Sequence, residues 1–195
     1  MKNKVAIIDY GAGNVQSVKN ALSRLSCQAV VTCDSELIRQ AGKVIFPGVG
    51  HAQAAMKNLK ATDLDTLIPT LKQPVLGICL GMQLMCRFCE EGATQGLGIF
   101  DVDVKKFDTT VKIPQIGWNR IENLKSDLFK NIKEKEFMYL VHSYYVPLND
   151  ACIAMTSYGE KYASAVQKDN FYGVQFHPEK SSKAGVQVLR NFLEL

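Results

Sequence analysis

The sequence lacks any long hydrophobic run. Its longest apolar stretches, such as residues 5–8 and 75–78, are far shorter than the roughly 20 residues that span a bilayer. The first four residues carry two lysines and lead directly into Val5, which leaves no room for the apolar core of a signal peptide. We therefore expect no membrane partner and a cytoplasmic location.

The sequence also lacks a concentration of charge of one sign. Its net charge of +4 is spread without a long basic run, so we expect no nucleic-acid partner. The 195 residues are 47% hydrophobic and 22% charged, which is typical of a globular protein. A chain of this length buries a core without a metal or disulfide, and no linker or repeat interrupts it. We predict a single domain over residues 1–195.

The cysteines lack the paired spacing of a zinc site or a disulfide framework. Cys86 and Cys89 form a C-x-x-C, but no second ligand pair accompanies them, and they fall inside a helix predicted over residues 81–90. We expect these two thiols to lie in the core. We expect reduced cysteines throughout, no metal and no cofactor; the six are Cys27, Cys33, Cys79, Cys86, Cys89 and Cys152.

Strand and helix signals alternate in the first half of the chain. Apolar runs predict strands over 5–8, 28–32, 44–46 and 75–78. Apolar residues three or four apart predict helices between them, and Val15, Val18, Leu22 and Leu25 share one helical face. Because parallel neighbours need crossover connections, this alternation predicts a mostly parallel sheet with helices on both faces.

The second half is dominated by strands with shorter connections. Strands are predicted over 102–107, 137–142, 152–157, 163–167 and 172–176. A final helix over 181–193 is expected to bury Val186, Leu189 and Phe192. The fold class predicted is α/β, with an antiparallel C-terminal extension of the parallel sheet. Gly11 and Gly13 suggest dinucleotide binding, but Gln16 replaces the third glycine of that motif, so we reject it.

Cys79 stands where a predicted strand meets a predicted helix. Gly77 and Gly81 flank it two residues away on either side, which is the spacing of a nucleophile elbow. Side chains in place of these glycines would collide with neighbouring backbone as the chain reverses. The turn places the sulfur at the carboxyl edge of the sheet, near a helix N-terminus that favours thiolate. The alternative is that Cys79 is a small buried hydrophobe.

The choice of general base is narrow because the chain has only three histidines. His177 follows the last predicted strand, and Pro178 holds it extended, so Glu179 would project to the same side and reach the imidazole. With Cys79 these residues form a candidate nucleophile–base–orienter triad, although the short motif alone also fits a simple turn. His142 lies in an apolar strand and His51 precedes a helix, which favours structural roles for both.

An oxyanion hole would need backbone N–H groups near the sulfur. One is expected from Leu80, the residue after the nucleophile. The second is expected from Gly48, Val49 and Gly50, whose glycines permit unusual backbone angles. A simple tight turn explains this segment equally well.

Together these segments resemble one known family. Residues 47–51 (PGVGH), 77–83 (GICLGMQ) and 176–182 (FHPEKSS) are similar to the motifs of class I, or triad, glutamine amidotransferases. Within that family the resemblance is closest to glutaminase subunits of imidazole glycerol phosphate synthase, supported by 117–119 (GWN) and 141–144 (VHSY). The similarity covers essentially the whole chain, and no catalytic position departs from the pattern.

The resemblance implies a flavodoxin-like fold and a heterodimer with a (β/α)8-barrel cyclase that uses the ammonia in histidine biosynthesis. It implies Cys79, His177 and Glu179 as the triad. Glutamine would lie near Gln83, Glu91, Ser143 and Tyr144, and the partner would contact Trp118, Tyr139 and Lys180.

Three rival functions stay open on the sequence alone. The chain could serve pyridoxal phosphate, purine or anthranilate synthesis as another class I glutaminase. It could use the same elbow as a cysteine peptidase or esterase. It could also be a catalytically silent subunit of an assembly, although the complete triad argues against this.

Overall fold

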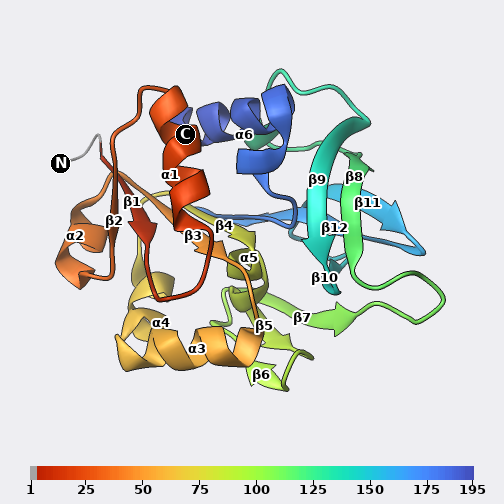
Figure 1. The fold of residues 1–195 in the computed structure, drawn as a ribbon, viewed down its shortest axis with the longest axis horizontal. Helices are drawn as coiled ribbons and strands as arrows, with labels where there is room; N and C mark the ends of the chain where they lie inside the picture. The colour runs from red at the N-terminus through yellow and green to blue at the C-terminus, as the bar shows by residue number, and fades with distance from the viewer. Residues whose placement is uncertain (1–3) are drawn as a thin grey trace.

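The chain builds an α/β structure around one large sheet (Figure 1). The computed structural model describes residues 4–195. The first half alternates strand and helix as predicted, with an additional short helix α2. Its elements are β1 (Val5–Ile8), α1 (Val15–Arg24), β2 (Ala29–Thr32), α2 (Ser35–Gln40), β3 (Lys43–Gly48), α3 (Ala52–Ala61), α4 (Leu64–Leu67), the 3-10 helix η1 (Ile68–Thr70), β4 (Val75–Cys79) and α5 (Leu80–Leu84).

The second half is mainly strands, again as predicted. The sequence patterns did not indicate β6, β8 or β10. Strands β6 and β10 are short, and in β8 apolar and polar residues do not alternate regularly. The elements are β5 (Cys86–Cys89), β6 (Thr94–Gln95), β7 (Phe100–Lys106), β8 (Gln115–Ile121), η2 (Asp127–Phe129), β9 (Glu136–His142), β10 (Tyr144–Pro147), β11 (Cys152–Tyr158), β12 (Glu160–Lys168), β13 (Phe171–Val174), η3 (Pro178–Lys180) and α6 (Ser182–Glu194).

The sheet is parallel in its first part and mainly antiparallel beyond it. Strands β2, β1, β3, β4 and β13 are parallel neighbours in that order, which is the 2-1-3-4-5 order of flavodoxin-like folds. Strands β12 and β10 continue the sheet in antiparallel pairing, and β11 pairs with β12. Strands β8 and β9 form a separate two-stranded ribbon. The predicted fold class is confirmed.

Both faces of the central parallel strands are buried, whereas the edge strand β2 is partly exposed. In β1, Val5 and Ile7 pack with α1 and α6, whereas Ala6 and Ile8 pack with α2, α3 and α4. Figure 1 shows α1 and α6 on one side of the sheet and α3 and α4 on the other. In α6, Leu189 and Phe192 are buried as predicted. Val186 is only half-buried, because the helix turns Val188 toward the core instead.

The helix predicted over residues 81–90 was wrong in its second half. Helix α5 ends at Leu84, and Cys86–Cys89 forms strand β5, which pairs with β6 and β7. The apolar spacing of this segment is compatible with a helix, and strand pairing with β7 overrides it. Cys86 and Cys89 are buried in the core, as expected.

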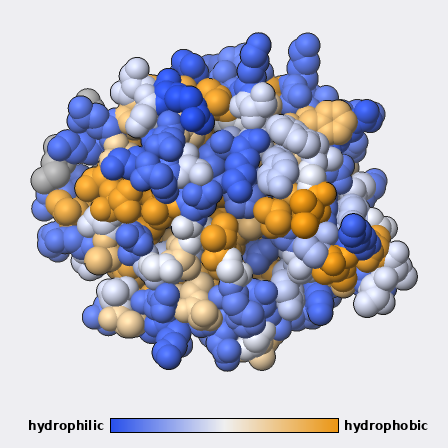
Figure 2. Space-filling model, viewed as in Figure 1, coloured by the Kyte–Doolittle hydropathy of each residue, from blue (hydrophilic) through white to orange (hydrophobic). Residues whose placement is uncertain are grey.

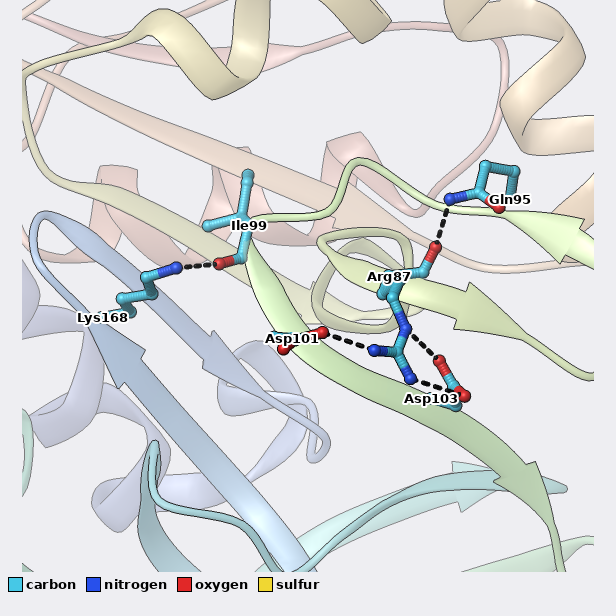
Figure 3. Close-up of polar contacts among 6 residues, drawn as sticks. All are labelled: Arg87, Gln95, Ile99, Asp101, Asp103 and Lys168. Atoms are coloured by element: carbon cyan, nitrogen blue, oxygen red, sulfur yellow. Dashed lines mark hydrogen bonds and ion pairs between the residues drawn. The ribbon is translucent and has the colours of Figure 1, made fainter.

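Polar contacts fasten these outer strands to one another (Figure 3). The guanidinium of Arg87 on β5 donates to Asp103 at 2.9 and 3.0 Å and to Asp101 at 2.6 Å, both on β7. Gln95 on β6 donates to the backbone carbonyl of Arg87 at 3.0 Å. Lys168 on β12 donates to the carbonyl of Ile99 at 2.9 Å, which joins this edge to the body of the sheet.

The surface in the view of Figure 2 is mostly polar, with apolar residues gathered in separate patches. None of the helices within residues 4–195 is long and apolar enough to cross a membrane. Across the same residues, no group of three or more histidine, cysteine, aspartate or glutamate side chains is arranged to hold a metal ion.

The turn from β4 into α5 is sterically tight. Cys79 adopts φ of 52°, a conformation that L residues rarely occupy. A Cβ on Gly81 would run into the carbonyl oxygen of Phe46, and one on Gly77 would lie 2.8 Å from the nitrogen of Met82. The predicted collision with neighbouring backbone is confirmed. Gly81 therefore allows α5 to approach β3 closely, and Gly77 allows it to approach β4.

We expect Gly81→Ala to lower the free energy of unfolding by about 3 kcal/mol, because the obstructing atom belongs to the backbone of a central strand. Gly98→Ala is the control. Its φ is +67° and no atom of residues 4–195 lies within 4 Å of an added Cβ, so the expected cost is backbone strain of about 1–2 kcal/mol. Urea unfolding measures both, and equal losses would contradict the steric explanation.

Candidate active site

Three parallel strands bring distant segments to one edge of the sheet. Gly48 at the end of β3 is in register with Cys79 at the end of β4. On the other side of β4, Val174 of β13 is in register with Ile78, so the chain reaches His177 just beyond the same edge. Cys79 and His177 line one cavity of about 290 Å³, which is small for a ligand site. The predicted convergence of these two side chains is found.

Glu179 is hydrogen-bonded to the imidazole of His177 on the side away from Nε2. Nδ1 of His177 lies 2.9 Å from Oε1 of Glu179, and the two side chains are 2% and 1% exposed. Because a carboxylate only accepts, Nδ1 carries the hydrogen. His177 itself is extended, as predicted, but the chain does not stay extended as far as Glu179. Residues Pro178–Lys180 form the 3-10 helix η3, and this turn brings Glu179 back onto the imidazole.

Ser181 fixes this turn against the neighbouring ribbon. Its hydroxyl donates to the carbonyl of His177 at 2.7 Å and accepts from the backbone N–H of Tyr139 at 2.9 Å. The N–H of His177 donates to the carbonyl of Tyr139 at 2.9 Å. Ser181 is fully buried, and no sequence signal distinguished it from an ordinary helix-capping serine.

The imidazole of His177 favours its charged form. Burial alone lowers the pKa of His177, but the neighbouring Cys79 and Glu179 outweigh burial and raise it to about 10. Among residues 4–195, Nε2 of this ring is buried without a hydrogen-bond partner. No group in this part of the chain competes for the proton of Nε2, so this nitrogen stays available for proton transfer.

The sulfur of Cys79 has two polar neighbours besides His177. Its S–H donates to the carbonyl of Val141 at 3.8 Å, and the side-chain amide of Gln175 donates to it at 3.5 Å. Gln175 could not be singled out from the sequence, because a single glutamine between apolar residues carries no motif signal.

The segment predicted to complete an oxyanion hole lies beside the sulfur. Val49, Gly50 and Leu80 line the cavity, whereas Gly48 lies in β3 and does not. Gly50 has φ of +105°, as expected of a glycine that redirects the backbone. The hydroxyl of Tyr10 donates to the carbonyl of Pro47 at 3.0 Å and anchors the start of the segment, a contact that the sequence did not reveal.

The residues expected near glutamine all line the same cavity: Gln83, Glu91, Ser143 and Tyr144. The amide of Gln83 donates to the carbonyl of Tyr144 at 2.9 Å and to Oε1 of Gln175 at 3.0 Å, which uses both of its hydrogens. Oε2 of Glu91 accepts from the backbone N–H of Ala52 at 2.7 Å, at the start of α3. Within residues 4–195, Oε1 of Gln83 and Oε1 of Glu91 make no hydrogen bond.

The two other histidines have structural contacts, as predicted. Nδ1 of His142 donates to the carbonyl of Tyr144 at 2.7 Å. Burial, with a smaller effect of His177, lowers the pKa of His142 to about 4, so its ring is neutral near pH 7. Nδ1 of His51 accepts from the N–H of Gln53 and caps α3.

The residues expected at a partner interface come together outside the cavity. Trp118 on β8 is 51% exposed, and its ring is 6.0 Å from that of Tyr139 on β9. Nζ of Lys180 lies 5.9 Å above the same tyrosine ring. Ile116 and Phe137 on this ribbon are also exposed, so the group forms part of an apolar face with a cation beside it.

The amino-acid sequence is similar to curated proteins over its whole length. Proteins described as imidazole glycerol phosphate synthase subunit HisH are 56% identical in Bacteroides fragilis, covering 98% of this chain and all of the relative. The protein of that description in Salmonella typhimurium is 48% identical, covering 98% of this chain and 99% of the relative.

The fold is similar to solved structures at low identity. A glutamine amidotransferase superposes with a TM-score of 0.76 at 17% identity, covering 97% of each chain. A chain of PurLQS from Thermotoga maritima superposes with a TM-score of 0.74 at 16% identity, covering 100% of this chain and 99% of that one. The family model described as glutamine amidotransferase class-I matches residues 6–195. The chain therefore belongs to the class I glutamine amidotransferases.

Proposed function

We propose that this chain is the glutaminase subunit of an imidazole glycerol phosphate synthase, and that it releases ammonia from glutamine for a cyclase partner. The observation that carries the proposal is the meeting of Cys79 and His177 in one small cavity, with Glu179 behind the imidazole. The identity to HisH subunits favours this function over glutaminases of other pathways.

In the first half of the reaction, the Cys79 thiolate attacks the carboxamide carbon of glutamine. The carbonyl oxygen becomes an oxyanion, which backbone N–H groups of Leu80 and of the segment Gly48, Val49 and Gly50 would stabilise. His177 then gives its Nε2 proton to the amide nitrogen. The carbon–nitrogen bond breaks, ammonia leaves and a glutamyl thioester of Cys79 remains.

In the second half, His177 takes a proton from water as the water oxygen attacks the thioester. The carbon–sulfur bond breaks, glutamate leaves and the thiolate is restored. Glu179 accepts from Nδ1 in both halves, which keeps Nε2 as the nitrogen that exchanges the proton. The same imidazole thus acts first as acid and then as base.

The cavity wall supports a free amino acid as substrate. Its volume of about 290 Å³ suits a small molecule rather than a folded peptide segment. Because both hydrogens of the Gln83 amide are used within the protein, this residue offers only an acceptor, Oε1, to the ligand. Glu91 adds a carboxylate oxygen. Two acceptors are the complement of an α-ammonium group, which supports glutamine over a peptidase substrate.

The partner proposed is a (β/α)8-barrel cyclase, docked on the face that contains Trp118, Tyr139 and Lys180. Exposed aromatic residues such as Trp118 are enriched at interface hot spots. A hollow of about 460 Å³ beside Trp118 and Phe137, also lined by residues of α6, would receive a side chain of the partner. We place this heterodimer in the cytoplasm and treat residues 1–195 as one domain.

Tyr139 would couple this face to catalysis. Its ring lies between Trp118 and Lys180, while its backbone holds the N–H of His177 and the hydroxyl of Ser181. Two residues along β9, Val141 lines the cavity. A shift of the ribbon on docking would therefore move the general base relative to the sulfur.

We expect Cys79→Ala to abolish glutamine hydrolysis, because it removes the sulfur that attacks the carboxamide in the proposed mechanism. The free energy of unfolding should stay within about 1–2 kcal/mol of wild type, since the side chain lost is small. Ammonia release and urea unfolding measure the two effects. Cys33→Ala, at an exposed thiol, is the matched control and should retain full activity. Residual hydrolysis by Cys79→Ala near the wild-type rate would rule out the mechanism.

We expect Glu179→Gln to lower turnover by about 1,000–10,000-fold, because the ring loses the group that orients it. The pKa of His177 should fall from about 10, since the carboxylate favours the imidazolium. In wild type, the raised pKa stabilises the fold fully below about pH 6.5, and this contribution is lost as the pH rises through about 10. NMR titration of the ring checks the shift, and an unchanged pKa would contradict this role of Glu179.

We expect Trp118→Ala to weaken binding of the purified cyclase subunit by about 30-fold, as for a central hot-spot aromatic. Lys180→Ala should weaken it less and leave stability near wild type. Val30→Ala removes an exposed apolar side chain on the distant edge strand β2 and is the control. Titration calorimetry measures the affinities. Equal affinities for Trp118→Ala, Val30→Ala and wild type would place the interface elsewhere.

A further inference from the structure

One buried side chain beside the sulfur has no place in the triad or in the glutamine subsite. Gln175 follows β13 and is 0% exposed. The polar atoms of buried amide side chains are usually hydrogen-bonded, because burying an amide without a hydrogen-bond partner costs free energy of desolvation. The partners of Gln175 are Cys79 and Gln83, and both line the cavity.

The two glutamine side chains form a directed chain of hydrogen bonds. The amide N–H of Gln83 donates to Oε1 of Gln175 at 3.0 Å, and the amide N–H of Gln175 donates to Sγ of Cys79 at 3.5 Å. Gln83 is itself anchored on the carbonyl of Tyr144 at 2.9 Å. Each donor therefore has a fixed direction, and the chain ends on the reacting atom.

We propose that Gln175 is a catalytic residue whose amide N–H stabilises the Cys79 thiolate, and that Gln83 is a positioning residue that fixes and polarises this donor. The inference deepens the proposed glutaminase function and rests on it. It gives the sulfur a neutral partner in addition to the charge of His177.

The physical basis is the difference between the two forms of the sulfur. A donor to a charged acceptor makes a shorter and stronger hydrogen bond than a donor to a neutral thiol, so Gln175 favours the thiolate. Donation from Gln83 to Oε1 draws electron density toward that oxygen and makes the N–H of Gln175 a better donor. Both bonds lie in a buried site, where competition from water is weak.

The arrangement also connects the ligand to the nucleophile. Oε1 of Gln83 has no hydrogen-bond partner within the described part of the chain and remains available to a bound substrate. A substrate ammonium that donates to this oxygen would polarise the Gln83 amide further. Its effect would pass through Gln175 to the sulfur, without any change in the positions of the backbone.

The test is the pH dependence of alkylation of Cys79 by iodoacetamide, in the full chain and without glutamine. The rate follows the thiolate fraction, so the pH at which the rate reaches half of its maximum reports how well the thiolate is stabilised. The tryptic peptide of residues 73–87 contains both Cys79 and Cys86, so fragmentation of this peptide by tandem mass spectrometry assigns the alkylated thiol. Gln175→Met keeps an unbranched side chain of similar size but removes the donor.

We expect Gln175→Met to move the midpoint upward by about one pH unit or more, because a hydrogen bond to a charged group is lost. Gln83→Met should move it upward by less, since the donor remains but is no longer polarised. Gln167→Met is the matched control. Gln167 also makes two side-chain hydrogen bonds, to Ser126 and Tyr172, away from the cavity, so its loss should affect stability only.

An unchanged midpoint in folded Gln175→Met would overturn the proposal, and would assign Gln175 to packing alone. If that variant does not fold, Gln83→Met decides: an upward shift supports the chain of donors, and an unchanged midpoint overturns it. Because alkylation needs no glutamine, a wild-type protein that fails to release ammonia would refute the proposed function separately, without changing these midpoints.

Discussion

The constraint on which the site depends is the parallel alignment of β3, β4 and β13. Their registers place Gly48, Cys79 and the segment after Val174 at one edge of the sheet, although these residues are far apart in the sequence. The backbone hydrogen bonds of parallel strands set this alignment before any catalytic side chain interacts. The tight approach of α5 to β3 then fixes the direction of the sulfur. The triad is therefore a consequence of the sheet, with side-chain contacts as the final adjustment.

The ribbon of β8 and β9 connects the cavity to the exposed aromatic face. One end of β9 supplies Val141 to the cavity, and further along the strand Tyr139 supports both His177 and the exposed aromatic face. A backbone bridge between Glu122 and Met155 joins the end of this ribbon to β11, and Met138 and Leu140 on its inner face are buried in the core. The nucleophile is thus carried by the central sheet, and the base is held partly by this ribbon.

The sequence predicted the fold class, and the side chains that it singled out for a site lie together in the structure, because both depend on strong local signals. Apolar runs located the parallel strands, and the glycines around Cys79 located the elbow. Contacts that depend on tertiary pairing were not predictable. The segment after Leu84 has helical spacing but is drawn into β5 by its pairing with β7. Gln175 and Ser181 are single polar residues whose importance comes entirely from what the fold places beside them.

The positive φ of Cys79 limits which residues that position accepts. A side chain branched at Cβ is a severe outlier in this region, because its second heavy atom crowds the local backbone. Threonine is therefore excluded as a substitute nucleophile, while serine, with an unbranched side chain, fits the same geometry. The range of chemistries that evolution can explore on this scaffold is narrowed by the backbone at one residue, before the reactivity of any hydroxyl or thiol is considered.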